Sequence, residues 1–496
     1  MAITAGGSLN SVVAPVQQTL ASNYIDFTSG TNDWSQQYLP DLMEKEAEVF
    51  GPRTISGFLS QVGAEESMTA DQVVWSEQGR LHLSYKGTVA TAGDTNGTFT
   101  CVTDIDGNGL TTTHGVRTND IVLIASAGIV TKCLVVETPN SSAVISVEPY
   151  DKADLTGHAT TASGSTLLVI GSEYGKGQSY TDETGTYKTE SRGANKPSFK
   201  SFSNKPIIMK DYYEISGSDA SQIGWVEISG EDGQSGYLWY LKAEGDTRSR
   251  FTDYLEMTML EAEKTVAASI IGFGEDGQIR GTADAGTNAG SEGLFAAIES
   301  RGNLTSGITG VNAATDLAEF DAILAEFDNQ GAIEENMMFV NRATSLAMDD
   351  MLASMNSYGA GGTSYGVFDN EEDMALNLGF SGFRRGSYDF YKSDMRYLND
   401  KATRGGINSA ATSAAIRGVI VPAGVSTVYD QSLGKNLKRP FLHVRYRSSQ
   451  TDNRKLKTWV TGAVGATTSA LDAMQVHYLS ERCLVTQGAN NFMLMK

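Results

Sequence analysis

Residues 237–274 read YLWYLKAEGDTRSRFTDYLEMTMLEAEKTVAASIIGFG and carry the strongest helical pattern in the chain. Apolar residues recur there every three to four positions: Phe251, Leu255, Met259, Ala262, Val266 and Ile270. This spacing places them on one stripe and predicts a helix from about Ser235 to Ile271. At about 1.5 Å per residue the helix would be roughly 50 Å long, a beam rather than an ordinary core helix.

The other face of this predicted helix is charged, and we interpret it as solvated. It carries Arg248, Arg250, Asp253, Glu256, Glu261, Glu263 and Lys264. The run Gly272-Phe-Gly-Glu-Asp-Gly277 follows and matches a dinucleotide-binding GxGxxG pattern. That motif needs a strand before it and a helix after it, so we interpret these glycines as the end of the helix.

A run of short β signals precedes the helix. The predicted strands are Thr98–Ile105, Asp120–Ala125, Val130–Glu137, Ala143–Pro149 and Ser165–Gly171, separated by turn clusters. Five short strands at this spacing predict a small barrel or sandwich at 87–172. On either side, 73–85 alternates and 175–205 is polar with few large aliphatic residues, which favours a two-stranded ribbon without a core of its own.

Mixed α and β patterns follow the helix. We expect a helix over Asp316–Asp328, a strand over Asn336–Val340 and a helix over Ala343–Met355 that is capped from Asn341. The chain ends in strands at Phe441–Arg447, Leu456–Gly462, Met474–Leu479 and Cys483–Val485.

Composition limits the function classes. The 38 Lys and Arg against 59 Asp and Glu give a net charge of −21, which argues against a broad nucleic-acid-binding face. Cys101, Cys133 and Cys483 have no CxxC spacing, so we expect neither a disulfide framework nor a metal site. No charged signal region precedes Lys45, and no apolar stretch is long enough to span a bilayer. We therefore expect a soluble protein made in the cytoplasm, without cofactors.

No set of catalytic residues emerges, so we expect no enzyme. Gly362-Thr-Ser-Tyr-Gly366 matches the GxSxG pattern of hydrolases but lies in a Gly-rich stretch, which we interpret as a loop. Asp104-Ile-Asp-Gly-Asn-Gly109 resembles the start of a calcium loop, but Gly115 stands where the bidentate Glu belongs. We interpret it as a tight turn.

Charge is unevenly distributed. Residues 214–328 hold 21 acidic and 6 basic side chains, whereas 435–457 holds 8 basic side chains and only Asp452. The basic segment is suited to DNA or to an acidic surface of the same or another copy, and we favour contact between copies. The candidate inter-subunit contacts are Lys188, Arg192, Lys196, Arg445, Arg447 and Lys455.

The order of these parts resembles the major capsid protein of tailed bacteriophages, with the Hong Kong 97-type fold. The features that carry the resemblance are an arm with a helix at Trp34–Phe50, the ribbon at Val73–Tyr85 and Gly177–Lys205, the long helix, Gly293-Leu-Phe-Ala-Ala-Ile-Glu, Phe320–Phe327 with Met338-Phe-Val-Asn-Arg, and the terminal strand Ala473–Glu481.

The resemblance implies an α+β capsid fold. Its parts would be an arm (1–60), an E-loop ribbon (61–86 and 173–210), an inserted β domain (87–172), a peripheral domain with the spine helix (211–285), an axial domain (286–440) and peripheral return strands (441–496). It implies pentamers and hexamers in an icosahedral virion shell that encloses double-stranded DNA and is assembled in the host cytoplasm. Portal, scaffolding and decoration proteins are the further partners, with no membrane. Some members crosslink Lys to Asn; Lys188 and Lys196 are candidates, but we find no acidic catalyst and predict no crosslink.

Two other functions stay open at this point. An encapsulin-like compartment shell would share the same fold. A carbohydrate-binding or hydrolytic protein would instead use the 87–172 insertion as its recognition module.

Overall fold

The computed structural model describes Leu59 and most of 64–496. The segments outside the description are 1–58, 60–63, 92–96, 111–113, 127, 139–142, 153–154, 159, 162–163, 178–198, 219–237, 266–271, 274–278, 281–286, 289, 332, 358–381, 424, 431–434 and 465–466. The predicted arm helix at Trp34–Phe50, the Gly362–Gly366 motif, and Lys188, Arg192 and Lys196 therefore lie outside the described residues. Val74–Phe202 form one compact unit, and the rest of the described chain forms the other.

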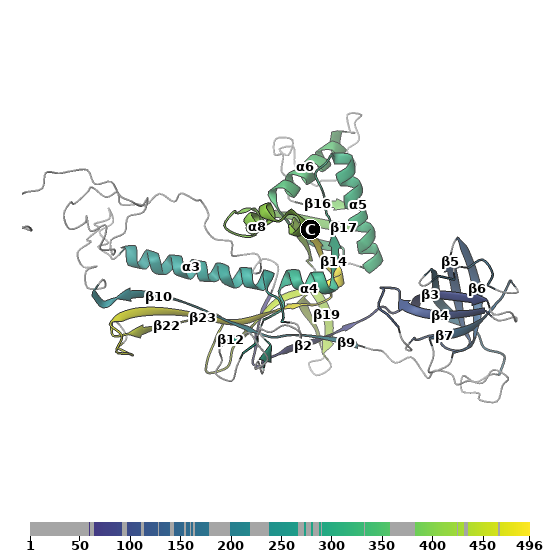
Figure 1. The fold of residues 1–496 in the computed structure, drawn as a ribbon, viewed down its shortest axis with the longest axis horizontal. Coiled ribbons are helices and arrows are strands. Elements are labelled where there is room, and N and C mark those ends of the chain that lie inside the picture. The colour runs from purple at the N-terminus through teal and green to yellow at the C-terminus, as the bar shows by residue number, and fades with distance from the viewer. Residues whose placement is uncertain are drawn as a thin grey trace, which may run out of the picture. The chain divides into compact units, whose positions relative to one another are not determined.

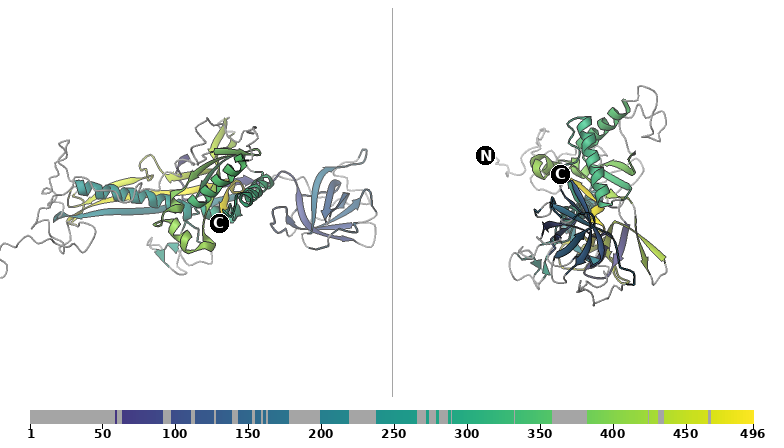
Figure 2. Two further views of the ribbon diagram at one scale, coloured as in Figure 1. Left: turned by 90° about the horizontal axis from the view of Figure 1, so that it is seen from above. Right: turned by 90° about the vertical axis from the view of Figure 1, so that its right-hand side faces the viewer.

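The smaller unit contains a closed β-barrel (Figures 1 and 2). Its strand order is β3 (Ser84–Thr91), β4 (Gly97–Asp104), β7 (Val144–Pro149), β6 (Ile129–Glu137), β5 (Asp120–Ser126) and β8 (Ser165–Ser172). Alternate residues point inward, and Phe99, Val122, Ile124 and Ile145 are fully buried. The barrel thus has a core of its own, which alternation along each strand provides.

Two details of the barrel bear on the sequence predictions. Tyr85, which we assigned to the ribbon, belongs to β3 and is 7 % exposed in the barrel core, because β3 pairs with β4 and β8 from Ser84 onward. The Asp104 segment is a tight turn: the Asp104 carboxylate accepts hydrogen bonds from the Asn108 backbone N–H and side-chain amide, both at 2.8 Å. Gly107 adopts φ +93° there, which favours glycine.

Strand β2 (Val73–Gln78) precedes the barrel in the chain, and strand β9 (Phe199–Asn204) follows it. The two strands pair to form a two-stranded sheet. The rings of Trp75 and Phe202 lie 6.3 Å apart on it. The strand predicted over Val73–Tyr85 is therefore interrupted, and Leu81 in the break is 84 % exposed.

The larger unit is built on two sheets. The first has the order β1 (Ala64–Met68), β21 (Leu442–Arg447), β23 (Ala473–Thr486) and β10 (Ile207–Ser216), with β22 (Lys457–Gly462) also paired to β23. Helix α3 (Leu238–Glu261) lies along β10 and β23 (Figure 1). Phe251 and Leu255 of α3 pack on Val476 and Tyr478, with the rings of Phe251 and Tyr478 6.0 Å apart.

The second sheet has the order β14 (Asn303–Thr305), β24 (Met493–Met495), β18 (Gly418–Pro422), β15 (Glu335–Val340), β17 (Tyr388–Asp394) and β16 (Gly382–Arg385). Helices α5 (Ala313–Gln330) and α6 (Arg342–Ser357) cover one face, where Phe320, Phe327 and Met351 pack on Met338 and Phe390. The Asn312 and Asn341 side chains cap these two helices, at 2.9 and 2.8 Å from the N–H groups of Thr315 and Thr344.

The other face of the second sheet joins the core of the first. That cluster contains Phe339, Val419 and Leu494 of the second sheet, Val444 and Leu484 of the first, and Met259 and Leu260 of α3. Residues of α4 (Leu294–Arg301) and α7 (Arg396–Asn399) complete it. The remaining elements are β11 (Gly272–Phe273), β12 (Ile279–Arg280), β13 (Thr287–Asn288), α8 (Arg404–Ala410), β19 (Val425–Asp430), β20 (Lys435–Pro440) and the 3-10 turns Thr412–Ala414 and Ala489–Asn491. None of the described helices combines the length and apolarity that crossing a bilayer requires.

Several predictions for this unit were wrong. The long helix ends at Glu261 and not near Ile271. The Ala262 carbonyl accepts the Gly293 N–H at 2.7 Å, and the backbone of 260–263 approaches Gly290 and Gly293 too closely for a side chain at either glycine. Gly272 lies in β11 and does not end the helix; β12 follows it, so the helix that a dinucleotide site needs is not formed there. The segment 64–68, which we placed in the ribbon, is β1 of the first sheet, and β24 at the chain's end joins the second sheet and not the first.

Candidate functional site

A cluster of ion pairs of the larger unit lies where β1 pairs with β21. The two strands are parallel, with Ala64 to Met68 opposite His443 to Arg447. The Ser448 N–H then donates to the Met68 carbonyl at 3.0 Å. Backbone pairing therefore fixes residues 64–68 to the first sheet.

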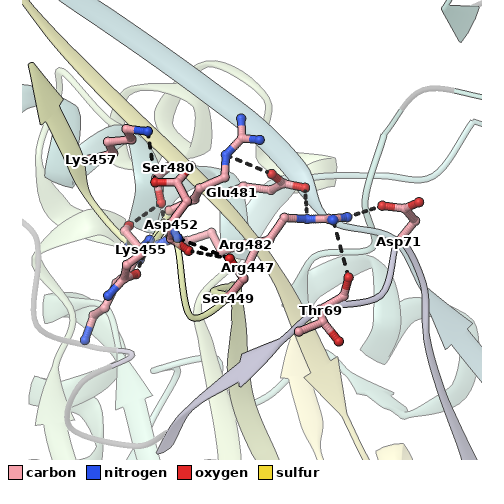
Figure 3. A network of polar contacts seen from close by, with 12 residues as sticks. Thr69, Asp71, Arg447, Ser449, Asp452, Lys455, Lys457, Ser480, Glu481 and Arg482 are labelled. Carbon is pink, nitrogen blue, oxygen red and sulfur yellow. Dashed lines mark hydrogen bonds and ion pairs between the residues drawn. The ribbon is translucent and has the colours of Figure 1, made fainter.

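Ion pairs hold β1 and the turn after it in place. Glu66 accepts from Arg445 at 3.0 Å, and Glu65 contacts Lys455. Arg447 contacts the Asp71 carboxylate and donates to the Thr69 carbonyl at 3.4 Å (Figure 3). Each of these cations belongs to the basic segment 435–457, which the sequence analysis identified. Its acidic partner comes from residues 65–71.

Glu481, in the middle of β23, is the buried centre of this network. Its side chain is 5 % exposed, and one oxygen faces the Nε atom of Arg447 at 2.8 Å (Figure 3). The other oxygen faces the Nε atom of Arg454 at 3.2 Å. A buried carboxylate is tolerated when cations neutralise it. Two guanidinium groups from one hairpin therefore allow β23 to continue through a charged position.

A shallow cavity of about 360 Å³ lies beside this network, lined by Asp452, Arg454, Lys457, Trp459 and Leu479. The Lys457 ammonium pairs with the Asp452 carboxylate at 2.9 Å, and both side chains are more than two-fifths exposed. Ser480 Oγ and Arg482 both donate to the Lys455 carbonyl, at 2.6 and 2.9 Å. These two hydrogen bonds fix the segment between β21 and β22, which forms one wall of the cavity.

An aromatic row crosses the same sheet beside the cavity. Tyr212, His477 and Trp459 stand opposite one another on β10, β23 and β22. The His477 ring is stacked 5.9 Å from the Tyr212 ring and 5.1 Å from the Trp459 ring. Since Val476 and Tyr478, one position away, face α3, this row lies on the sheet face opposite the helix. Tyr212 is 55 % exposed and Ile208, on the same strand, is 52 % exposed.

The structure thus places three of the six candidate contact residues. Arg445, Arg447 and Lys455 converge on the β1–β21 junction and each has a carboxylate partner within its own copy. Contact between copies through these residues stays a prediction. Sequence reasoning missed Glu65, Glu66, Asp71 and Glu481. The acidic residues at 65–71 were a signal, but only the fold shows which cations they meet.

The groups of the described residues that could take part in catalysis or metal binding are few. They contain no cluster of three His, Cys, Asp or Glu side chains that fits a metal ion. Burial raises the pKa of the thiols of Cys133 and Cys483 to about 12, so neither is a ready nucleophile. Ser126 Oγ contacts His158 Nδ1 at 2.7 Å, but the other ring nitrogen faces the Thr131 hydroxyl at 2.9 Å where a hydrolase would have a carboxylate.

Comparisons with known proteins give structural neighbours only. No family model matches the chain, and no curated protein matches it. The structure of Gordonia phage Cozz is similar at 8 % identity and a TM-score of 0.40, covering 97 % of both chains. That of Microbacterium phage Oxtober96 is similar at 9 % identity and a TM-score of 0.38, covering 95 % of this chain and 99 % of the other. The capsid of an empty GTA particle is similar at 9 % identity and a TM-score of 0.32, covering 95 % and 98 %. These neighbours are phage and capsid structures.

Proposed function

We propose that this chain is the major capsid protein of a tailed phage, which assembles through pentamers and hexamers into an icosahedral shell around double-stranded DNA. The observation that carries the proposal is the sheet of β10, β23 and β22. Helix α3 covers one of its faces, while the other presents Tyr212 and Ile208 to solvent, beside a cavity that Trp459 lines. Exposed aromatic and apolar faces rimmed by charge are typical of protein–protein interfaces.

The parts of the fold suit a shell subunit. In this proposal α3 and the first sheet form the peripheral domain, and the second sheet with α5 and α6 forms the axial domain. The β2–β9 pair begins an E-loop that carries the barrel as an insertion. Lys188, Arg192 and Lys196 remain proposed contacts of that loop with a neighbouring copy.

Electron microscopy of the expressed chain tests the proposal. We expect shells when the chain is produced with its own scaffold, if it needs one, and particles from infected cells should contain double-stranded DNA. Shells that enclose an enzyme in place of DNA would favour the encapsulin-like function. Only small species under every assembly condition would contradict the capsid assignment.

A pair of variants tests the sheet face itself. Tyr212→Lys should leave the subunit folded, because this ring is exposed, but should block or misdirect assembly. The matched control is Tyr254→Lys on α3, where the side chain is 44 % exposed and lies away from the aromatic row. Equal assembly by both variants would remove this face from the proposal.

A further inference from the structure

Strand β10 (Ile207–Ser216) is an edge strand of the first sheet: among the described residues, only β23 pairs with it. All ten of its residues are in register with β23, without a shift. Neither a proline nor a bulge, which commonly protect an edge strand, interrupts it. The described part of the sheet therefore ends in a row of backbone N–H and C=O groups to which a further strand can add.

Two hydrogen bonds show which residues of β10 direct these groups away from β23. The Gly217 N–H, just after the strand, donates to the Asp472 carbonyl at 3.0 Å, so odd-numbered positions face β23. The Tyr212 N–H donates to the carboxylate of the preceding residue, Asp211, at 2.9 Å, as an N–H that points away from β23 would. Because backbone groups alternate along a strand, the even-numbered residues of 208–216 face the outer edge.

This edge is complementary to itself in the antiparallel direction. When Tyr212 lies opposite Tyr212 of a second copy, Lys210 of each copy lies opposite Glu214 of the other. These three side chains are exposed and lie on the sheet face away from α3. On the face toward α3, the same register places the apolar Met209 opposite Ile215. One two-fold axis perpendicular to the sheet therefore forms two ion pairs, one aromatic pair and two apolar pairs.

We propose that β10 pairs antiparallel with β10 of a second copy of this chain, with Tyr212 opposite itself, so that the first sheets of the two copies become one. In this register the Tyr212 N–H exchanges the Asp211 carboxylate for the carbonyl of the opposing Tyr212. The charges of Lys210 and Glu214 select the register, since opposite charges then face each other twice.

The contact rests on the proposed function in one respect. A single pair of strands buries less surface than a standard interface, so it is weak between free subunits. It becomes populated when an assembling shell holds the copies close together. Because the contact needs a two-fold axis between neighbours, it belongs between adjacent pentamers or hexamers and not between the subunits within one ring.

Crosslinking of two cysteine variants of the full chain tests the register. Ile208→Cys and Ser216→Cys lie at opposite ends of β10, and the proposed register places each opposite the other. The native cysteines are buried, so a short bismaleimide acts on the introduced ones. Particles assembled from a mixture of the two variants should give covalent dimers. Particles of either variant alone are the matched control, because equal positions are separated by eight residues, roughly 27 Å along the strands.

Two results of this experiment would overturn the proposal. One is an equal dimer yield from the mixture and from the single variants, and the other is normal particles whose mixture gives no dimer. Normal particles without these dimers reject this inference alone, whereas an inability of the unsubstituted chain to form particles rejects the capsid function.

Amide hydrogen exchange of the unsubstituted chain tests the edge itself. In free subunits the even-numbered amides of 208–216 should exchange faster than the odd-numbered ones, which bond to β23. On assembly the amides of Lys210, Tyr212 and Glu214 should become at least about tenfold slower. Unchanged exchange at these three residues would contradict the pairing. Slower exchange without dimers from the cysteine mixture would mean that another segment occupies the edge, which also overturns it.

A charge exchange tests the two ion pairs. With Lys210→Glu in both cysteine variants, the dimer yield should fall about fivefold, because both symmetry-related pairs become repulsive. Adding Glu214→Lys should restore the yield, since the pairs re-form with reversed sign. Glu214 also accepts from Gln475 Nε2 at 2.6 Å within its own copy, so the double variant is compared with Lys210→Glu and not with Glu214→Lys alone. Failure of this restoration excludes the proposed register.

Discussion

Glu256 of α3 accepts a hydrogen bond of 3.1 Å from the backbone N–H of Leu59, which lies 197 residues earlier in the chain. Both residues are buried, and Leu59 packs in the shared core with Met259 and Leu260. A carboxylate that we predicted to be solvated thus joins the spine helix to the segment that precedes β1.

This contact predicts different outcomes for two substitutions at one position. Glu256→Ala leaves the buried Leu59 N–H without this acceptor and should cost about 1–3 kcal/mol in the free energy of unfolding. Glu256→Gln keeps an acceptor oxygen and should be close to neutral. Denaturant unfolding with amide exchange at Leu59 measures both, and the exposed Ser249→Ala on the same helix is the control. Equal losses for Ala and Gln would mean that charge, and not the hydrogen bond, is what matters.

Glu481 predicts a larger effect. Glu481→Gln leaves Arg447 and Arg454 facing a neutral amide in a site where the side chain is 5 % exposed. Breaking a buried pair in this way should destabilise the larger unit by about 3 kcal/mol. Asp452→Asn removes the exposed pair with Lys457 and should cost less than about 1 kcal/mol. Thermal unfolding of the two variants compares them, and a similar cost for both would contradict the central role of Glu481.

The same residue shows what the sequence can and cannot predict. We predicted separate strands over Met474–Leu479 and Cys483–Val485, which leaves Ser480, Glu481 and Arg482 between them. The structure has one strand, β23, over Ala473–Thr486. Ser480 and Glu481 are buried within it because the Lys455 carbonyl accepts from Ser480, and Arg447 and Arg454 neutralise Glu481.

Local patterns were reliable where a segment supplies its own core. The predicted strand Asp120–Ala125 is β5 (Asp120–Ser126), and Val130–Glu137 is β6 (Ile129–Glu137). The helix predicted over Asp316–Asp328 is likewise present, as α5 (Ala313–Gln330). The parallel pairing of β1 with β21 carries no local signal, since almost 380 residues separate the two strands. The helix end at Glu261 was also hidden, because the packing of 290–293 against it decides the position.

His158 predicts a pH dependence of the barrel's stability. Burial, with a smaller effect of Lys152, lowers the pKa of His158 below its ordinary value of 6.5. The unfolded chain then binds this proton at a higher pH than the folded barrel does. Stability that is present above about pH 6.5 should therefore fall as the pH decreases below 6.5, until the folded histidine is also protonated. Thermal unfolding of the barrel between pH 8 and pH 5 measures this loss, and His158→Gln should flatten it; an equal slope in the variant would assign the effect to another group.

Arg445 decides between contact within a copy and contact between copies. Arg445→Glu places a carboxylate beside Glu66, which Arg445 now contacts at 3.0 Å, so β1 should detach from β21 and shell assembly should fail. Assembly failure in this variant alone does not separate the two roles. The exchange Arg445→Glu with Glu66→Arg rebuilds the pair inside the copy, while it still reverses the charge that any neighbouring copy would meet at position 445. Glu66 and Arg445 lie opposite each other in the β1–β21 pairing. We therefore expect the exchange to restore the protease resistance of the β1 segment. We also expect it to restore shell assembly, which electron microscopy measures. Restored resistance without assembly would instead show that a neighbouring copy needs the charge of Arg445 itself, as the basic segment predicted.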